Sequence, residues 1–175
     1  IAVVCLNGRE NVLQLYENHF MIDKLKWIFP GGNTGMESIH NGVYGLKEMG
    51  CNDEDLVLIH DGVRPLLSQE IISSNIAICK AYGYAITGIQ CREAILESGD
   101  GFTSTTSIPR DTLIRTQTPQ TFRLKNIIRA HESAYKKGIV NSVASCTLLA
   151  ELDENIEMQI VPVAEKNIKI TTVED

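Results

Sequence analysis

Two side chains of opposite charge follow the most apolar run of the sequence. Residues 56–60 are apolar until the last position, and Asp61 and Arg64 come next, in the segment His-Asp-Gly-Val-Arg-Pro. A guanidinium can hold a phosphate through two parallel hydrogen bonds, and a carboxylate can position a ribose hydroxyl or a magnesium-bound water. The pair therefore favours phosphate chemistry. The structural alternative is an Asp61–Arg64 salt bridge that only stiffens a turn.

A second polar group lies further along the chain. Arg110 precedes the segment Arg-Thr-Gln-Thr-Pro-Gln-Thr-Phe at 115–122, in which Thr118 and Gln120 flank Pro119. Hydroxyl and amide groups of this kind could line a pocket for a polyol or a phosphate. Pro119 excludes a helix interior and favours an extended backbone at the residue before it. The alternative is that one of the threonines caps the helix that follows.

A glycine-rich loop precedes the second expected helix. Gly31, Gly32 and Asn33 stand in the segment Gly-Gly-Asn-Thr-Gly-Met-Glu-Ser, which ends at Ser38. Glycines let backbone N–H groups approach an anion or a base closely. An ordinary turn, with Ser38 near the helix N-terminus, explains the same residues equally well.

One lysine near the end of the chain is a further candidate. In the segment Asn-Ile-Lys-Ile-Thr, an extended backbone would place the two isoleucines on one side and Lys169 on the other. Lys169 could then reach a phosphate. A solvated lysine at a sheet edge is the alternative, and the pattern alone does not choose between the two.

Apolar strand-like runs alternate with segments of helical periodicity. We expect strands at 1–6, 26–29, 56–60, 85–90, 114–117, 156–161 and 167–170, and helices at 10–20, 37–49, 69–82, 124–137 and 143–151. This alternation is typical of an α/β fold with a mainly parallel sheet flanked by helices on both faces. Ligands of such folds collect at the carboxyl ends of the strands, where the candidate residues stand.

The alternation is interrupted between residues 91 and 115. Short alternating runs surround Gly99-Asp100-Gly101, which is a hairpin signal. We expect a β-arm there that leaves the main sheet and returns to it at the strand near residue 114.

The composition indicates one globular domain over residues 1–175. The sequence is 43% apolar and 22% charged, and its net charge of -6 gives no bulk attraction to nucleic acid or to an anionic membrane. Five cysteines, odd in number and far apart, argue against a disulfide framework and a zinc site and favour a cytoplasmic protein. The chain opens directly in a strand-like run, so we expect the domain to be incomplete at its N-terminus.

Four segments occur in the order found in one enzyme family: GGNTGMESIHNGV, LIHDGVRP, RTQTPQTF and NIKITT. The sequence thereby resembles the family of methylerythritol-phosphate and ribitol-5-phosphate cytidylyltransferases, with HDGVRP and TPQTF closer to the ribitol branch. The resemblance implies a Rossmann-like fold and a homodimer in which each β-arm crosses the partner's active site. The implied reaction joins CTP and a polyol phosphate into a CDP-polyol, with release of pyrophosphate and with Mg²⁺ as cofactor.

The resemblance also implies roles for individual residues. Asp61, Arg64, Arg110 and Lys169 would be catalytic, and Asp61 would also help indirectly to hold the metal. The cytidine would be bound by Gly31, Gly32, Asn33 and Ser38. Polyol-phosphate binding would fall to Thr118, Gln120 and Ser142, with Arg110 and Thr118 serving the neighbouring subunit.

The sequence departs from the family pattern at several ligand-facing positions. The family's N-terminal glycine-rich loop with its Arg and Lys is absent, so we expect the 175-residue chain alone to be inactive. Gly35 replaces a common Arg, Glu93-Ala94 replaces Asp-Thr in the arm, and Asn141 replaces an acidic residue. A degenerate, non-catalytic nucleotide-binding or dimerisation domain is therefore the competing hypothesis. Some members of the ribitol branch are fused to a reductase domain, and a fusion is possible here.

Overall fold

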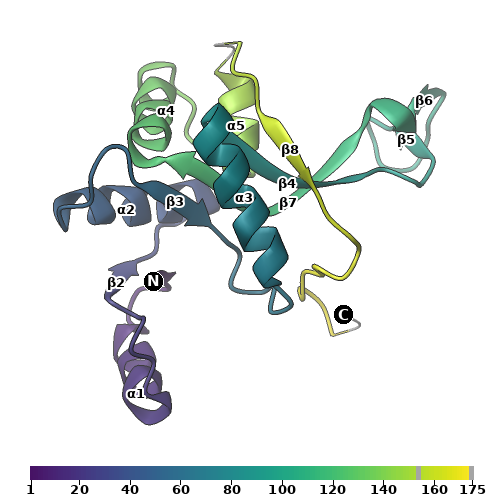
Figure 1. Ribbon diagram of the computed structural model, residues 1–175. Helices are drawn as coiled ribbons and strands as arrows, with labels where there is room; N and C mark the ends of the chain where they lie inside the picture. Colours follow the sequence, from purple (N-terminus) through teal and green to yellow (C-terminus); the bar gives the residue numbers. More distant parts are fainter. Residues whose placement is uncertain (153–154, 174–175) are drawn as a thin grey trace.

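The computed structural model describes residues 1–152 and 155–173, in which strands and helices alternate along most of the chain (Figure 1). The helices are α1 (Glu10–Phe20), α2 (Gly35–Glu48), α3 (Gln69–Tyr82), α4 (Leu124–Lys136) and α5 (Ser145–Glu151). The strands are β1 (Ala2–Cys5), β2 (Trp27–Pro30), β3 (Leu56–Ile59), β4 (Tyr84–Gln90), β5 (Ile95–Glu97), β6 (Thr106–Ile108), β7 (Ile114–Arg123) and β8 (Gln159–Pro162). The predicted α/β class is confirmed. No helix in the described part of the chain is long and apolar enough to span a membrane.

The main sheet has four strands in the order β3-β7-β4-β8. β4 and β8 pair in parallel, whereas β7 runs antiparallel to both β3 and β4. Three of the four strands therefore share a direction, but β7 lies between β3 and β4, so the sheet contains one parallel pair and two antiparallel pairs instead of being mainly parallel. Its reversal has a simple cause: the chain leaves β4 through the arm and returns directly into the neighbouring strand, which is a hairpin connection and gives antiparallel pairing.

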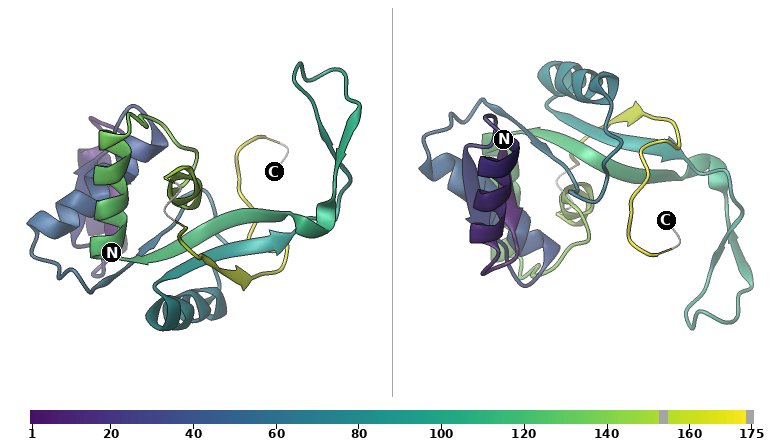
Figure 2. Two further views of the ribbon diagram at one scale, coloured as in Figure 1. Left: turned by 90° about the horizontal axis from the view of Figure 1, so that it is seen from above. Right: turned by 90° about the horizontal axis from the view of Figure 1, so that it is seen from below.

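Helices cover both faces of this sheet, as Figure 2 shows. α3 packs along one face against all four strands, and α4 and α5 lie on the other face with α2 beyond them. The largest side chains of the core are at most 2% exposed and come from β4, β7, α4 and α5 and the residue after α5: Ile86, Phe122, Leu124, Ile127, Leu148, Leu149 and Leu152. This packed layer supports the edge of the sheet at which the candidate residues stand.

β1 and β2 form a separate two-stranded parallel sheet at the N-terminal side, and α1 lies next to β2 (Figure 1). α1 has no buried residue, although Leu15, Tyr16 and Phe20 make one of its faces apolar. α2 joins this unit to the rest of the molecule, because it contacts β1 and β2 and also α4. The glycine-rich loop after β2 therefore belongs to this smaller sheet.

The β-arm predicted for residues 91–115 is confirmed. β5 and β6 pair antiparallel as their own sheet and project away from the body (Figures 1 and 2). The η1 turn at Arg110–Thr112 brings the chain back into β7. At the tip, the Asp100 carboxylate accepts hydrogen bonds from the backbone N–H groups of Phe102 and Thr103 at 2.9 and 2.8 Å, which closes the turn.

Two expected strands differ from the structure. The strand predicted at 114–117 continues through Pro119 to Arg123. The strand predicted at 167–170 is a loop. The alternating pattern there misled because Asn167 turns inward, 1% exposed, and bonds to β7 through its side chain instead of joining a ladder. The alternative in which a threonine caps the helix after β7 is wrong, since α4 begins without a side-chain cap.

Candidate active site

The site forms at one edge of the main sheet because β7 runs against its neighbours. Ile59, the last residue of β3, pairs with Gln120, so Thr118 lies beside the loop that follows β3. The backbone N–H of Asp61 donates to the Thr118 hydroxyl at 3.0 Å. The loops after β3 and β8 and the first half of β7 thus meet at this edge.

Asp61 holds two cationic side chains. Its Oδ2 lies 3.2 Å from Arg64 Nε and 3.5 Å from Lys169 Nζ. Arg64 Nη1 also donates to the Asn167 carbonyl at 2.8 Å, and the Arg64 side chain is only 10% exposed against 46% for Lys169. The Asp61–Arg64 salt bridge exists, but the two residues do more than stiffen a turn, since their contacts with Thr118, Asn167 and Lys169 join three segments distant in sequence. We name Asp61, Arg64, Thr118 and Lys169 the Asp61 cluster.

The loop that presents Lys169 is held by Asn167, to which the sequence alone assigns no role. Asn167 Nδ2 donates to Gln117 Oε1 at 2.9 Å and to the Thr118 carbonyl at 2.8 Å. Backbone hydrogen bonds attach the two ends of residues 163–170 to β4 and to the loop after β3. A buried Asn inside a polar segment leaves no periodic signal, so only the structure reveals this anchor.

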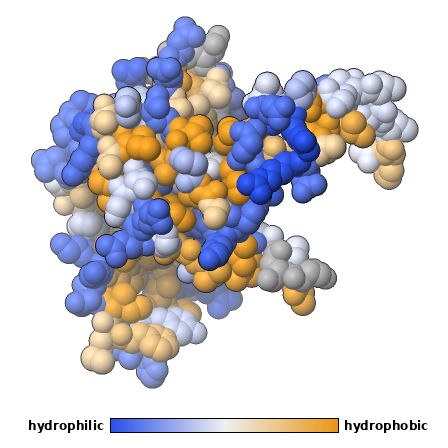
Figure 3. All heavy atoms as spheres, turned by 45° about the vertical axis from the view of Figure 1, so that its right-hand side comes forward, coloured by the Kyte–Doolittle hydropathy of each residue, from blue (hydrophilic) through white to orange (hydrophobic). Residues whose placement is uncertain are grey.

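A hollow of about 250 Å³ opens beside the cluster. Its charged lining consists of Arg64, Arg115, Glu165 and Lys169. Three cations against one anion make the hollow positive, although the whole chain carries a net charge of -6. Figure 3 shows strongly hydrophilic residues gathered where the arm joins the body. An anionic group such as a phosphate is the ligand that this lining favours.

The glycine-rich loop satisfies its own backbone donors. Gly31 donates to a carbonyl of β1, Gly32 N–H donates to Ser38 Oγ at 3.0 Å, and Asn33 N–H donates to the Glu37 carboxylate at 2.6 Å. A Cβ on Gly32 would lie 2.2 Å from Glu37 Cβ, so this glycine is required by packing. The arrangement is a helix cap, as the structural alternative expected. No described hydrogen bond joins this loop to the Asp61 cluster, so its role in holding a nucleotide stays a prediction.

Gln120 is a correction. It is 2% exposed, its Oε1 accepts from the backbone N–H of Cys146 at 3.0 Å, and its Nε2 lies 3.4 Å from the Gln117 carbonyl. The amide ties β7 to the N-terminus of α5 and is not free to bind substrate. All residues of β7 from 119 to 122 are buried, because helices cover both faces of the sheet there.

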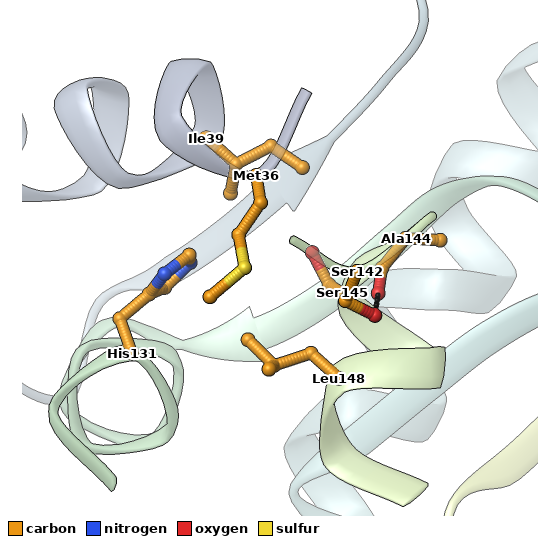
Figure 4. A pocket seen from close by; sticks show the side chains of 7 residues that line it. All are labelled: Met36, Ile39, His131, Ser142, Ala144, Ser145 and Leu148. Carbon is orange, nitrogen blue, oxygen red and sulfur yellow. Dashed lines mark hydrogen bonds between the residues drawn. The ribbon is translucent and has the colours of Figure 1, made fainter. Parts of the chain in front are cut away.

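Ser142 is a second correction. It is 6% exposed, and its hydroxyl lies 2.8 Å from that of Thr147 and 3.2 Å from Glu151 Oε1. It lines a small pocket among α2, α4 and α5 into which Met36 and His131 point (Figure 4). This pocket shares no lining residue with the hollow, so the structure gives Ser142 a role in packing rather than at the Asp61 cluster.

Arg110 and Thr118 lie apart, although the resemblance expects them to act together. Arg110 Nη1 donates to the Arg92 carbonyl at 2.7 Å at the base of the arm, and no described hydrogen bond links it to the Asp61 cluster. Thr118 belongs to that cluster within the same chain. The expectation that both serve the neighbouring subunit stays a prediction for Thr118 and for Arg110.

The residues around Asp61 do not by themselves make a metal site. The described residues contain no group of three or more His, Cys, Asp or Glu side chains that could hold a metal ion. Asp61 is the one carboxylate of its cluster, and its Oδ2 already faces two cations. A divalent ion would find only this one carboxylate among the residues of the cluster, so the cluster alone does not make a metal site.

The sequence of this chain is similar to those of known cytidylyltransferases. Residues 1–175 match the family described as IspD, 2-C-methyl-D-erythritol 4-phosphate cytidylyltransferase. A ribitol-5-phosphate cytidylyltransferase of Lacticaseibacillus paracasei is 33% identical over 177 residues, covering 100% of this chain and 74% of the relative. A 2-C-methyl-D-erythritol 4-phosphate cytidylyltransferase of Clostridium acetobutylicum is 35% identical over 157 residues, covering 89% of this chain and 65% of the relative.

Solved structures give the same answer. The 4-diphosphocytidyl-2C-methyl-D-erythritol synthase of Anaerococcus prevotii superposes with a TM-score of 0.81 at 26% identity, covering 99% of this chain and 74% of that one. The family match spans the printed sequence, and the relatives share about a third of its residues. The chain therefore belongs to the IspD family of cytidylyltransferases, which are nucleotidyltransferase enzymes.

Proposed function

We propose that the complete gene product transfers CMP from CTP to a polyol phosphate, releasing pyrophosphate, and that ribitol 5-phosphate is the acceptor; that the 175-residue chain alone is inactive stays a prediction. The observation that carries the proposal is the Asp61 cluster beside a positively lined hollow. Two cations held by one carboxylate at the edge of an α/β sheet form a site for phosphate groups. The family membership then selects cytidylyl transfer among phosphate reactions.

The chemistry needs no covalent intermediate. An oxygen of the acceptor phosphate attacks the α-phosphorus of CTP, a new P–O bond forms, and the bond from the α-phosphorus to the β-bridging oxygen breaks. Pyrophosphate leaves with that electron pair. Arg64 and Lys169 would neutralise the negative charge of the two approaching phosphates, and Asp61 would keep both cations in place. Positioning and charge neutralisation are sufficient for this class of reaction.

Magnesium is part of the proposal, but as a companion of the nucleotide. Mg²⁺ in nucleotide sites is usually bound by one or two carboxylates together with substrate phosphates. Asp61 is the one carboxylate that the Asp61 cluster would offer such an ion, and its Oδ2 also faces Arg64 and Lys169. The metal would supply charge neutralisation on the triphosphate, while the residues of this chain orient the acceptor.

Two observations favour ribitol 5-phosphate over 2-C-methyl-D-erythritol 4-phosphate. Relatives that carry the ribitol name match all of this chain, at 33% identity over 175 residues or more. The segment His-Asp-Gly-Val-Arg-Pro also resembles the ribitol branch. Methylerythritol phosphate remains the second candidate, because relatives of that name are 35% identical. The ribitol product would serve wall or capsule polymers, and the methylerythritol product would serve isoprenoid precursors.

We further propose a homodimer formed through the arm. Two large apolar side chains on the arm are exposed, Leu96 at 63% and Phe102 at 95%. A second copy of the chain is the partner that would cover them and bring Arg110 to its site. All five cysteines are free thiols, which fits the cytoplasmic location that we propose.

The test is release of pyrophosphate by the complete gene product with CTP, Mg²⁺ and either acceptor. Release with ribitol 5-phosphate alone is the expected result. Release with methylerythritol 4-phosphate alone would replace the acceptor but keep the reaction. Release with neither, from protein that is folded by circular dichroism, would overturn the proposal and favour the degenerate, non-catalytic domain.

A further inference from the structure

One ion pair at the hollow has no part in the Asp61 cluster. Arg115 stands in the first half of β7 and Glu165 in the loop after β8, and Arg115 Nη2 lies 2.6 Å from Glu165 Oε2. Both side chains are well exposed, at 59% and 65%. An exposed ion pair contributes little to stability, so a stronger anion can replace the carboxylate at little cost.

The three cations of the hollow differ in their freedom to move. Arg64 is largely buried and is held by both Asp61 and the Asn167 carbonyl. Lys169 lies near the same carboxylate, at 3.5 Å. Among the ion pairs of the described residues, Arg115 is paired only with the exposed Glu165. Its planar guanidinium can bind a phosphate through two hydrogen bonds.

We propose that Arg115 binds a terminal phosphate of a phosphorylated substrate in this hollow and that Glu165 is the carboxylate which this phosphate replaces. The inference rests on the proposed function in taking the ligand to be the acceptor phosphate or the triphosphate of CTP. A phosphate carries more charge than a carboxylate and offers Arg115 a two-pronged partner, so the exchange is favourable.

The loop geometry allows this exchange without rebuilding the site. Asn167 pins residues 163–170 to β7 two positions after Glu165, through bonds of 2.8 and 2.9 Å. The Glu165 side chain can therefore swing into solvent while Lys169 keeps its place. The neighbouring Lys166 does not line the hollow and serves as a control for a charge change on the same loop.

The first experiment uses inorganic phosphate as the probe, titrated into the complete gene product and followed by NMR. For Arg115→Gln we expect roughly tenfold weaker phosphate binding, since a charge-assisted hydrogen bond is lost. For Glu165→Gln we expect about two- to fivefold tighter binding, because Arg115 is released. Lys166→Gln should bind phosphate like the wild type. Equal affinity of Arg115→Gln and wild type would overturn the inference.

Kinetics then identify which phosphate Arg115 holds. Arg115→Gln should raise KM by roughly tenfold or more for the substrate concerned, with kcat nearly unchanged and with partial rescue in Arg115→Lys. A higher KM for the acceptor would show that Arg115 binds the acceptor phosphate. A higher KM for CTP would show that it binds the triphosphate of the nucleotide. A residue that only supports the fold would lower the melting temperature without a selective change in KM, and that result would contradict the inference.

Failure of the inference is distinguishable from failure of the proposed function. Turnover by wild type with no change in Arg115→Gln would remove the role of Arg115 and keep the reaction. Phosphate binding that depends on Arg115, in a wild type that releases no pyrophosphate, would keep the anion site and remove the reaction.

Discussion

Asp61 is the residue on which the geometry of the site depends, because one of its oxygens faces both Arg64 and Lys169. The Asp61 carboxylate and the Lys169 side chain are partly exposed, so their ion pair contributes little to the stability of the fold. The main effect of the carboxylate is to orient the two cationic side chains. Without the Asp61 carboxylate, the Arg64 and Lys169 side chains would be free to rotate. They would then have to be ordered before they could stabilise the negative charge of the transition state.

For Asp61→Asn we expect kcat/KM to fall by roughly two orders of magnitude, since a positioned electrostatic partner is lost at the reacting phosphates. The melting temperature should change little. Asp23→Asn, an exposed change in the loop after α1, is the control and should leave both quantities unaltered. An unchanged kcat/KM for Asp61→Asn would show that the cluster is a structural ion pair.

Asn75 is the buried residue that supports the site from behind. It is 0% exposed, donates to Thr87 Oγ1 at 2.9 Å and lies 3.4 Å from Thr121 Oγ1, while Thr87 donates to the Pro119 carbonyl at 2.6 Å. This network joins α3 to the segment of β7 that carries Thr118.

Asn75→Ala should lower the free energy of unfolding by about 2–3 kcal/mol, because it removes the acceptor of the buried Thr121 hydroxyl and a donor to Thr87, and opens a small cavity. Chemical denaturation measures the difference. Ser73→Ala, an exposed change on the same helix, should be neutral or slightly stabilising. Equal losses in the two variants would contradict the role of the network.

At the level of elements, the glycine loop before α2 offers a matched pair of substitutions. A Cβ on Gly32 would collide with Glu37, whereas a Cβ on Gly35 meets nothing within 4 Å. Gly32→Ala should therefore disrupt the cap of α2 and lower the melting temperature, and Gly35→Ala at the first turn should leave it equal or higher. If the loop also holds CTP, affinity for CTP falls only in Gly32→Ala. Equal melting temperatures would contradict the packing argument.

The tip of the arm depends on one carboxylate. Hydrogen bonds from Thr103 and Phe102, backbone first, and from the Thr103 and Ser98 hydroxyls hold the pKa of Asp100 well below its ordinary value. The stabilising form is the charged one. Its contribution is therefore complete above the ordinary Asp pKa of about 4 and is lost only as the pH falls toward the lowered value.

Amide hydrogen exchange tests this element directly. Asp100→Ala should expose the N–H groups of Phe102 and Thr103 to fast exchange at neutral pH, while Asp111→Ala at the base of the arm should leave them protected. In the wild type, protection of these two amides should persist down to about pH 4. Loss of protection with a midpoint at or above that pH would contradict the lowered pKa.

The sequence predicted the elements better than it predicted the side chains of the site. Periodicity located α1 and α3 at their observed bounds and indicated the arm, because burial of one face leaves a repeating pattern. It also led to Asp61, Arg64 and Lys169, since polar residues at strand ends converge. It failed for Gln120, because this part of β7 is buried on both faces and a polar residue there leaves no alternating signal. It also failed for Asn167, whose inward turn is a tertiary effect.

On the scale of the whole molecule, acid stability should depend on how α2 packs against α4. His131 is 5% exposed, its Nε2 has no hydrogen-bond partner, and its ring meets that of His40 at 5.6 Å. Burial, with a smaller contribution from His40, lowers the pKa of His131 to about 4. The fold thus holds this imidazole neutral, whereas the unfolded chain takes up a proton near the ordinary value of about 6.5.

The direction in which the free energy of unfolding changes with pH follows from this difference in proton binding. Below about pH 6.5 the unfolded state binds a proton that the folded state refuses, so the free energy of unfolding decreases as the pH falls, by up to about 3 kcal/mol near pH 4. His131→Leu removes the titrating group and should flatten this part of the stability curve, while His19→Leu on the exposed α1 should not. Denaturation at pH 7 and pH 5 measures both slopes. Equal slopes in wild type and His131→Leu would contradict this role of the buried histidine at the α2–α4 contact. They would mean that other titrating groups lower the stability of the protein between pH 7 and pH 5.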